Sequence, residues 1–142
     1  MEAFERQVIP VAELSNPHTV RVYWEDTDAG GVVYYANYLK FFERARTEWL
    51  RALGVDQGRL QAEQDCIFVV AEVQLRYLQA ARLDDCLQVT ACVTEQGKAS
   101  LQLQQQVWRG STLLAEGRVR IGCVQASTMK PCRIPVQVSA LL

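Results

Sequence analysis

Three acidic residues, Glu25, Asp26 and Asp28, come just ahead of the glycine pair Gly30 and Gly31 and of a strong helical pattern. A carboxylate can serve as a general base or as a nucleophile, and the N-terminal end of a helix offers unpaired N–H groups that can polarise a carbonyl oxygen. The positive end of the helix dipole also keeps a nearby carboxylate ionised. Because each acid could equally be a helix cap or a solvated turn residue, the residue types alone leave the choice among them open.

The sequence lacks the residues and motifs that most other catalytic mechanisms require. His18 is the only histidine, so one chain cannot build a histidine-rich metal site, and any catalytic triad would have to use this residue. We expect His18 at the surface or at a strand edge, with a role in a site as the alternative. The sequence has no G-x-S-x-G, G-x-G-x-x-G or P-loop pattern, which leaves carboxylate chemistry as the favoured route.

Composition narrows the class of protein. The 142 residues carry a formal net charge of -1 and are 49% apolar, so no global basic field points to nucleic acid or to an anionic membrane. No apolar run reaches the length of a membrane span, and residues 1–13 lack the basic start and apolar segment of a secretory signal. Five cysteines have wide spacing without a C-x-x-C pair, so neither a zinc knuckle nor a dithiol redox motif is predicted. We expect reduced thiols in a cytoplasmic protein.

A long helix is predicted from about residue 32 to residue 53. Its apolar residues fall on one broad arc at helical spacing, which predicts a helix largely wrapped by other structure. Gly54 follows as a stop signal. Arg46 is the exception because it falls inside the apolar arc, and we expect Glu43, three residues earlier, to be its ion-pair partner.

Strand patterns dominate the rest of the chain. Residues 18–25 are β-prone, a short polar helix is expected at 57–64, and period-two alternation predicts further strands at 69–77, 87–94, 101–107 and 118–123. The turns between these strands are short, which favours antiparallel neighbours. Most of the glutamines at 101–106 are expected on a solvated or interface face of their strand.

One α+β domain over residues 1–142, with its core at about 18–135, is the architecture that these patterns predict. Packing the long helix against the concave face of a sheet buries the apolar surfaces of both. Such a domain rarely hides all of its sheet edges, so we expect self-association.

A family resemblance adds to this reading. The segment from Val22 to Gly31, VYWEDTDAGG, resembles the signature of hotdog-fold thioesterases related to 4-hydroxybenzoyl-CoA thioesterase, and the match continues through VVYYANYLKFFERARTEWLR to Arg51. Within that group the chain is most similar to the Tol-Pal-associated acyl-CoA thioesterases of the YbgC type, which the stretches 77–85 and 129–135 also resemble. The resemblance runs from about Thr19 to Pro135.

The resemblance implies a hotdog fold, an antiparallel sheet of five or six strands around one long helix, in dimers that usually pair into tetramers. It implies hydrolysis of acyl-CoA thioesters without a metal or another cofactor, since CoA is part of the substrate. The family's catalytic aspartate falls on Asp28, and the backbone N–H that polarises the thioester carbonyl falls on Tyr35. Asp26 becomes the structural acid. Some members carry histidine where this chain has Tyr35, so a mechanism that needs this histidine is not expected here.

Substrate contacts follow from the same expectation. Gly30 and Gly31 let substrate approach the backbone closely, and Tyr34 and Tyr35 are expected to line the acyl pocket. Cations should line the entrance that receives the CoA phosphates. The candidates by position are Lys98, Lys130 and Arg133.

The main hypothesis is a thioesterase for short or medium acyl or aryl groups, and it has two alternatives. A hotdog dehydratase usually needs a histidine beside an acid at the helix, and that region has none. A non-catalytic module that binds acyl-CoA or acyl-carrier protein, or that joins an envelope complex, stays open. The sequence does not decide acyl chain length, the preference between CoA and carrier protein, or whether Asp28 attacks the carbonyl or activates water.

Overall fold

A computed structural model describes residues 17–142 of the chain. The segment 1–13, which we predict to be no secretory signal, and the first residues of the predicted domain lie outside the described part. Among the described residues, no helix combines the length and the apolar character needed to span a membrane.

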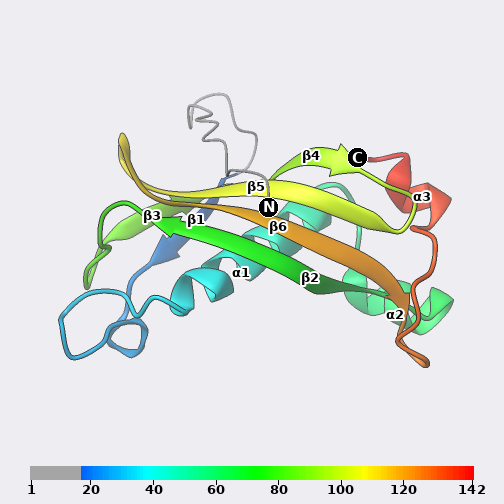
Figure 1. The fold of residues 1–142 in the computed structure, drawn as a ribbon, viewed down its shortest axis with the longest axis horizontal. Coiled ribbons are helices and arrows are strands. Elements are labelled where there is room, and N and C mark those ends of the chain that lie inside the picture. The colour runs from blue at the N-terminus through cyan, green and yellow to red at the C-terminus, as the bar shows by residue number, and fades with distance from the viewer. Residues whose placement is uncertain (1–16) are drawn as a thin grey trace.

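Six strands form one antiparallel sheet in the order β1-β3-β5-β6-β2, with β4 also paired to β5. The long helix α1 lies along one face of this sheet (Figure 1). The strands are β1 (His18–Arg21), β2 (Cys66–Tyr77), β3 (Cys86–Val89), β4 (Cys92–Gln96), β5 (Ser100–Arg109) and β6 (Thr112–Gln125). The helical elements are η2 (Trp24–Asp26), α1 (Asn37–Ala52), α2 (Gln57–Gln64) and α3 (Val136–Ser139). The predicted α+β class, the antiparallel sheet and the short helix at 57–64 are therefore confirmed, and His18 opens the edge strand β1.

The helix α1 buries its apolar arc but begins later than predicted. Phe41 and Phe42 are fully buried against the sheet. The expected start at residue 32 is wrong, because Val32 and Val33 are extended and make single β-bridges to Arg82 and Thr27. β-branched residues suit this extended backbone. The C-terminal prediction is confirmed, since the helix ends at Ala52 and a left-handed glycine follows at position 54.

Two predicted strands differ from their patterns, one by ending early and one by being divided. The β-prone run at 18–25 yields a strand only to Arg21, because the chain then turns into η2. The run at 87–94 is divided into β3 and β4 at Thr90 and Ala91. β3 and β4 pair with β5 in the same register, Val89 opposite Val107 and Cys92 opposite Gln104, so the interruption leaves both along one edge of β5.

A bulge in β2 changes which residues face α1. Val70 pairs with Ile121 and Val73 pairs with Val119, so the register gains one residue, and the irregularity lies between Val70 and Glu72. Directly opposed residues share a face of the sheet. Val70 and Val73 therefore share one face, whereas strict alternation would separate them. The alternation predicted from residue 69 is correct only beyond the bulge.

Arg46 finds a different partner from the one predicted. Its Nη1 donates to Gln105 Oε1 at 2.9 Å, and Gln105 Nε2 in turn donates to the carbonyl oxygens of Phe42 and Thr90. Burial lowers the pKa of the Arg46 guanidinium, and the charge of Glu43 only offsets this in part. A neutral amide thus connects the helix to the sheet where the sequence predicts an ion pair.

Three of the four glutamines of β5 are buried, contrary to the prediction of a solvated or interface face, and Gln102 is half-buried. Gln104, Gln105 and Gln106 are between 0% and 7% exposed. Two of these side-chain amides bond to neighbouring groups: Gln105 makes the three bonds given above, and Gln106 Oε1 accepts from Trp108 Nε1 at 3.2 Å.

Gly117 of β6 lies where α1 approaches the sheet most tightly. A Cβ atom added there would stand 2.5 Å from Phe42 Cε2 and 3.1 Å from the Gln74 carbonyl oxygen. Phe42 is fully buried and has little room to move aside. The absence of a side chain at this position is therefore a condition for the helix-to-sheet packing.

Candidate active site

The loop between η2 and α1 is organised by Asp26. This residue is 8% exposed, and its Oδ2 accepts a hydrogen bond from the Tyr23 N–H at 2.9 Å. Its carbonyl oxygen accepts from the Tyr34 N–H and from Asn37 Nδ2, both at 2.9 Å. Asp26 thus ties the loop to the first turn of α1, as a structural acid would.

Asp28 is exposed and sits at the tip of the same loop. Its Oδ1 accepts a hydrogen bond from the Gly30 N–H at 2.9 Å, and its backbone N–H donates to the Val32 carbonyl at 2.9 Å. No described residue donates to Oδ2, so one carboxylate oxygen faces solvent without a partner. Gly31 has φ of +79°, a left-handed conformation that favours glycine.

Unpaired N–H groups lie at the start of α1. The N-cap residue Ala36 has no side-chain cap, and within residues 17–142 the N–H groups of Tyr35 and Ala36 have no acceptor. The rings of Tyr34 and Tyr35 lie beside them, with centroids 4.6 Å apart. The arrangement can place a hydrogen-bond donor against a carbonyl oxygen close to a carboxylate.

An aromatic pocket of about 290 Å³ opens at the helix start. Tyr35, Tyr38 and Tyr77 line it together with Val32, Val33 and residues 78–80. Tyr38 and Tyr77 meet edge to face with centroids 5.3 Å apart. Burial raises the pKa of both hydroxyls, so both stay protonated at neutral pH. Tyr77 Oη donates to the Tyr35 carbonyl at 2.8 Å, which links the pocket wall to the loop.

Replacing Tyr77 with phenylalanine tests this link. We expect kcat to fall about three- to tenfold, because losing one hydrogen bond removes about 0.5–1.5 kcal/mol of positioning of the peptide at Tyr35. KM should change little, since the ring that lines the pocket remains. Steady-state kinetics give both values, and an unchanged kcat would show that the hydroxyl does not hold the loop in its working position.

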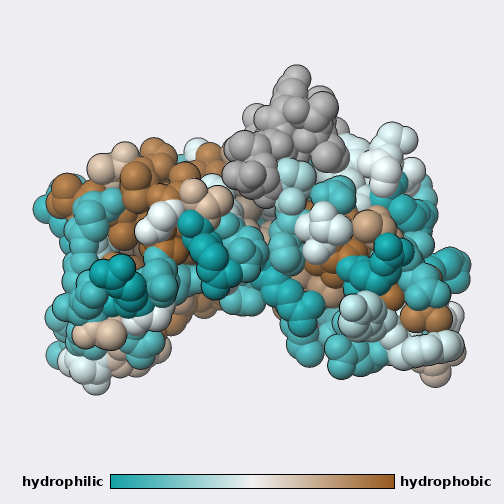
Figure 2. Space-filling view, turned by 180° about the vertical axis from the view of Figure 1, so that it is seen from behind, coloured by the Kyte–Doolittle hydropathy of each residue, from teal (hydrophilic) through white to brown (hydrophobic). Residues whose placement is uncertain are grey.

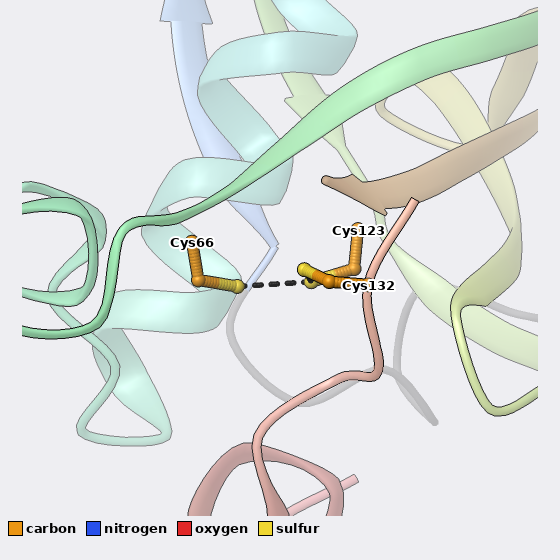
Figure 3. Close-up of side chains that lie close together, drawn as sticks. All are labelled: Cys66, Cys123 and Cys132. Atoms are coloured by element: carbon orange, nitrogen blue, oxygen red, sulfur yellow. Dashed lines mark hydrogen bonds between the residues drawn. The ribbon is translucent and has the colours of Figure 1, made fainter. Parts of the chain in front are cut away.

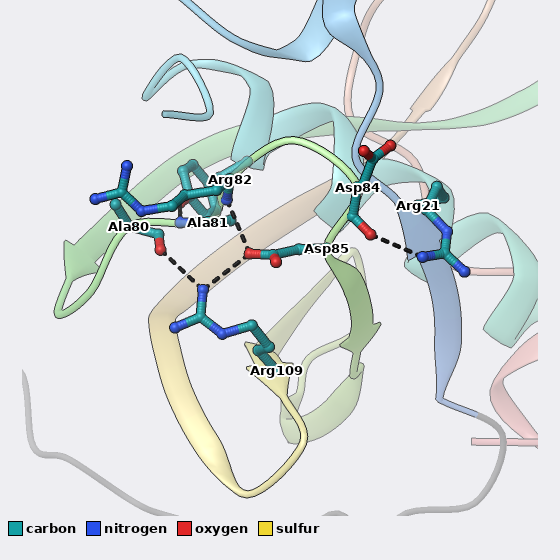
Figure 4. Close-up of polar contacts among 8 residues, drawn as sticks. Arg21, Ala80, Ala81, Arg82, Asp84, Asp85 and Arg109 are labelled. Carbon is teal, nitrogen blue, oxygen red and sulfur yellow. Dashed lines mark hydrogen bonds and ion pairs between the residues drawn. The ribbon is translucent and has the colours of Figure 1, made fainter. Parts of the chain in front are cut away.

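A second loop, residues 80–85, supports the loop between η2 and α1. The Val33 N–H donates to the Ala81 carbonyl at 2.8 Å, and the Ala81 N–H donates to Tyr38 Oη at 3.2 Å. Arg109 Nη1 donates to Asp85 Oδ2 at 2.8 Å and to the Ala80 carbonyl at 3.2 Å (Figure 4). These bonds fix the wall against which the loop between η2 and α1 rests.

The charge on Asp85 is held by its neighbours. Partial burial opposes ionisation, but the hydrogen bond from the Arg82 N–H and the guanidinium of Arg109 outweigh it, so the pKa of Asp85 is lowered. Sequence reasoning missed Asp85 and Arg109 as supports of the site. The only signal was that the stretch 77–85 resembles the family without an obvious catalytic residue.

The three cations predicted for CoA binding lie far from Asp28 in the same chain. The Lys98 carbonyl accepts from the Ile134 N–H, and Lys130 bonds to Gln125, which pairs with Cys66 at the start of β2. Tyr77, at the other end of β2, donates to the Tyr35 carbonyl in the loop between η2 and α1. A strand of this length spans about 35 Å. The chain thus brings Asp28, Gly30, Gly31, Tyr34 and Tyr35 together in one loop. In Figure 1 this loop lies at one end of the sheet, and the β4–β5 turn and the tail after β6, which carry the three cations, lie at the other.

Hydrophilic and hydrophobic residues share the face of the molecule that lies behind the view of Figure 1. Figure 2 views the molecule from behind and shows hydrophilic residues across the middle of this face, with hydrophobic residues gathered toward both ends. Several large apolar or aromatic side chains are exposed near α1 and β2, among them Leu39, Val70 and Tyr77.

Comparisons with known proteins give a consistent result. The family model "Thioesterase-like superfamily" matches residues 22–142. "Acyl-CoA thioesterase YbgC" of Haemophilus influenzae is 48% identical over 121 residues, which cover 85% of this chain and 89% of that protein. "Acyl-CoA thioester hydrolase YbgC" of Escherichia coli O6:H1 is 45% identical over 122 residues, covering 85% and 90%. The crystal structure of "Probable Thioesterase from Bartonella henselae" superposes with a TM-score of 0.81 at 32% identity, over 84% of this chain and 98% of that chain.

Proposed function

The chain belongs to the thioesterase-like superfamily and is a hotdog-fold acyl-CoA thioesterase, and from this premise we propose that Asp28 is its catalytic carboxylate and that the Tyr35 N–H polarises the thioester carbonyl. One observation carries this proposal: a single short loop holds an exposed carboxylate and unpaired N–H groups at the mouth of an aromatic pocket.

Hydrolysis requires attack on the carbonyl carbon, support for the oxyanion and departure of the CoA sulfur. With the acyl group in the pocket, the carbonyl oxygen would accept a hydrogen bond from the Tyr35 N–H. On a general-base route, Asp28 removes a proton from water, the water oxygen bonds to carbon, the C–S bond breaks, and the proton passes to the departing sulfur. On a nucleophilic route, a carboxylate oxygen of Asp28 bonds to the carbonyl carbon and the C–S bond breaks, which gives a mixed anhydride and the CoA thiolate. Water then cleaves the anhydride, regenerates the Asp28 carboxylate and supplies the protons of the free acid and the CoA thiol. Both routes yield free acid and CoA and use neither a metal nor a further cofactor.

The pocket favours a short or medium acyl group or an aryl group. Its volume of about 290 Å³ is small, and Tyr35, Tyr38 and Tyr77 present ring faces and edges to an occupant. Aromatic rings pair well with one another in offset or edge-to-face contacts. An aryl thioester would therefore gain ring contacts that an alkyl chain does not.

The phosphates of CoA need cations near the mouth of the pocket. Arg82 is exposed, and its backbone forms a β-bridge with Val32, which lines the pocket. We therefore propose Arg82 as a phosphate-binding cation that the same chain supplies. Lys98, Lys130 and Arg133 would reach a substrate at Asp28 only from another copy of the chain. Their predicted role thus depends on self-association.

A homo-oligomer is supported by the character of β2. This strand of twelve residues is the last in the sheet order, and no strand among residues 17–142 pairs with its outer edge. A groove of about 430 Å³ runs between it and α1, lined in part by Leu39, Val70 and Val73. Long edge strands beside apolar surface commonly pair with another chain. We propose a dimer through this edge, with pairing of dimers into a tetramer as the family resemblance implies.

A cytoplasmic location fits the free thiols of all five cysteines, which persist in reducing compartments. An association with the Tol-Pal envelope complex or with an acyl-carrier protein rests on the resemblance to the YbgC type.

Release of CoA thiol tests the function. The purified chain is assayed on straight-chain acyl-CoAs of increasing length, on an aryl-CoA, and on an acyl-carrier-protein thioester that bears the same acyl group as one of the CoA substrates. We expect turnover on short, medium and aryl substrates and a decline on long chains. Binding without turnover on every substrate would overturn hydrolysis and favour the non-catalytic module.

A further inference from the structure

Three cysteine side chains converge at the end of the sheet that is remote from Asp28. Cys66 opens β2, Cys123 lies near the end of β6, and Cys132 lies in the tail that follows β6, residues 126–135 (Figure 3). Cys123 Sγ is 2.9 Å from Cys66 Sγ and 3.6 Å from Cys132 Sγ, and all three sulfur atoms lie within 4.8 Å of one another. Cys66 and Cys123 are buried, and Cys132 is half-buried.

Backbone hydrogen bonds, rather than the thiols themselves, bring these residues together. Strand pairing of β2 with β6 places Cys123 opposite Phe68, next to Cys66 on the same face. The tail then folds back on β6, where the Cys132 N–H donates to the Cys123 carbonyl at 2.9 Å and the Gln125 N–H donates to the Lys130 carbonyl at 2.9 Å. The scaffold therefore holds the three sulfur atoms close before any ligand arrives.

The spacing of the sulfur atoms suits a metal ion. A zinc–sulfur bond of about 2.3 Å in a tetrahedral site places sulfurs about 3.8 Å apart. The Cys123–Cys132 separation of 3.6 Å is already near this value, and opening the Cys66–Cys123 separation from 2.9 Å needs a shift of about one ångström. Thiolates select soft ions such as zinc(II) and copper(I).

We propose that Cys66, Cys123 and Cys132 bind one soft metal ion, zinc(II) or copper(I), as three thiolates. Burial raises the pKa values of the Cys66 and Cys123 thiols, so without an ion both are protonated at neutral pH. Metal binding releases those protons to solvent, and the positive charge of the ion compensates thiolates that would otherwise be costly inside the protein. The half-buried Cys132 leaves one side of the ion open to water.

The bound ion would join the start of β2, the end of β6 and the tail. A ligand that binds only the folded chain raises its stability by mass action. The cluster lies about 35 Å along β2 from the catalytic loop, so metal binding is expected to leave thioester hydrolysis unchanged. Failure of this proposal and failure of the proposed function are thus separate results.

Metal titration of the reduced full chain tests the site. After treatment with chelator and reductant, the protein is titrated with Zn²⁺ alone and, without oxygen, with Cu⁺ alone, and native mass spectrometry gives the stoichiometry. We expect one ion per chain for at least one metal, a raised Tm, and X-ray absorption showing sulfur ligands at about 2.3 Å. Absence of stoichiometric binding by both metals would overturn the proposal.

Serine variants locate the ion. Cys132→Ser is the first choice because this side chain is half-buried and its loss disturbs the core least. It should weaken binding about a hundredfold or more. The matched control is Cys86→Ser, which changes an exposed thiol of β3 outside the cluster and should bind as the wild type does. If Cys132→Ser binds as tightly as the control, the ion is held elsewhere and the proposal is wrong.

Discussion

Replacing Asp28 with asparagine is expected to lower kcat roughly 10²–10⁴-fold, the range that removal of a positioned general base typically costs. Asparagine retains an Oδ1 that can accept the Gly30 N–H, so the loop should keep its shape. What it loses is the charge that takes a proton from water or attacks the carbonyl carbon. KM should therefore change far less than kcat. Thiol release under saturating acyl-CoA measures the effect.

Glu25→Gln is the matched control, because it makes the same acid-to-amide change at an exposed position of the same segment. It should keep most of the activity. The thermal midpoints of both variants should stay near that of the wild type, since both side chains are exposed. Near-wild-type turnover by Asp28→Asn would end the assignment of Asp28, whereas an equal loss in Glu25→Gln would point to a general effect of charge.

Gly117→Ala is expected to lower the free energy of unfolding by about 1–3 kcal/mol, the usual cost of adding a methyl group to a filled core. The new Cβ would stand 2.5 Å from Phe42 Cε2, and the fully buried Phe42 ring has no open space to enter. The helix or the ring must shift for the methyl group to fit. Urea unfolding followed by circular dichroism gives the change.

Gly122→Ala in the same strand separates this packing effect from the ordinary effect of replacing glycine. The nearest atom to a Cβ at Gly122 is the Ala99 carbonyl oxygen at 4.0 Å, an ordinary contact. Its free energy of unfolding should stay within about 0.5 kcal/mol of the wild type. Equal stabilities of the two variants would mean that α1 can move away from β6 at little cost.

The sequence predicted those features that depend on local pattern. The apolar arc of α1, the stop at Gly54 and the antiparallel strands all follow from side-chain spacing within one element. The start of α1 did not follow, because Val32 and Val33 also fit a helical arc and only their bridges to distant backbone keep them extended.

Tertiary contacts account for what pattern could not predict. Arg46 bonds to Gln105, which is 59 positions away, whereas helical spacing can indicate only near neighbours such as Glu43. The thiol cluster joins residues 57 and 9 positions apart, and spacing rules for metal sites are built on closer pairs. The distance of Lys98 from Asp28 likewise depends on the direction in which β5 and β6 run. The positions of charged residues along the sequence do not indicate this direction.

During synthesis on the ribosome, β2 is made well before the strand with which it pairs. Its one strand neighbour among the described residues, β6, is completed at Gln125, so at about 5–20 residues per second β2 waits roughly 2–10 s for this partner. An unpaired β-rich strand is an aggregation hazard. The helix α1 is made before β2 but covers only part of its apolar face, since Val70 and Val73 line the groove between the two elements. Glu72 and Arg76 point to the other face, where charges discourage pairing with a second nascent chain.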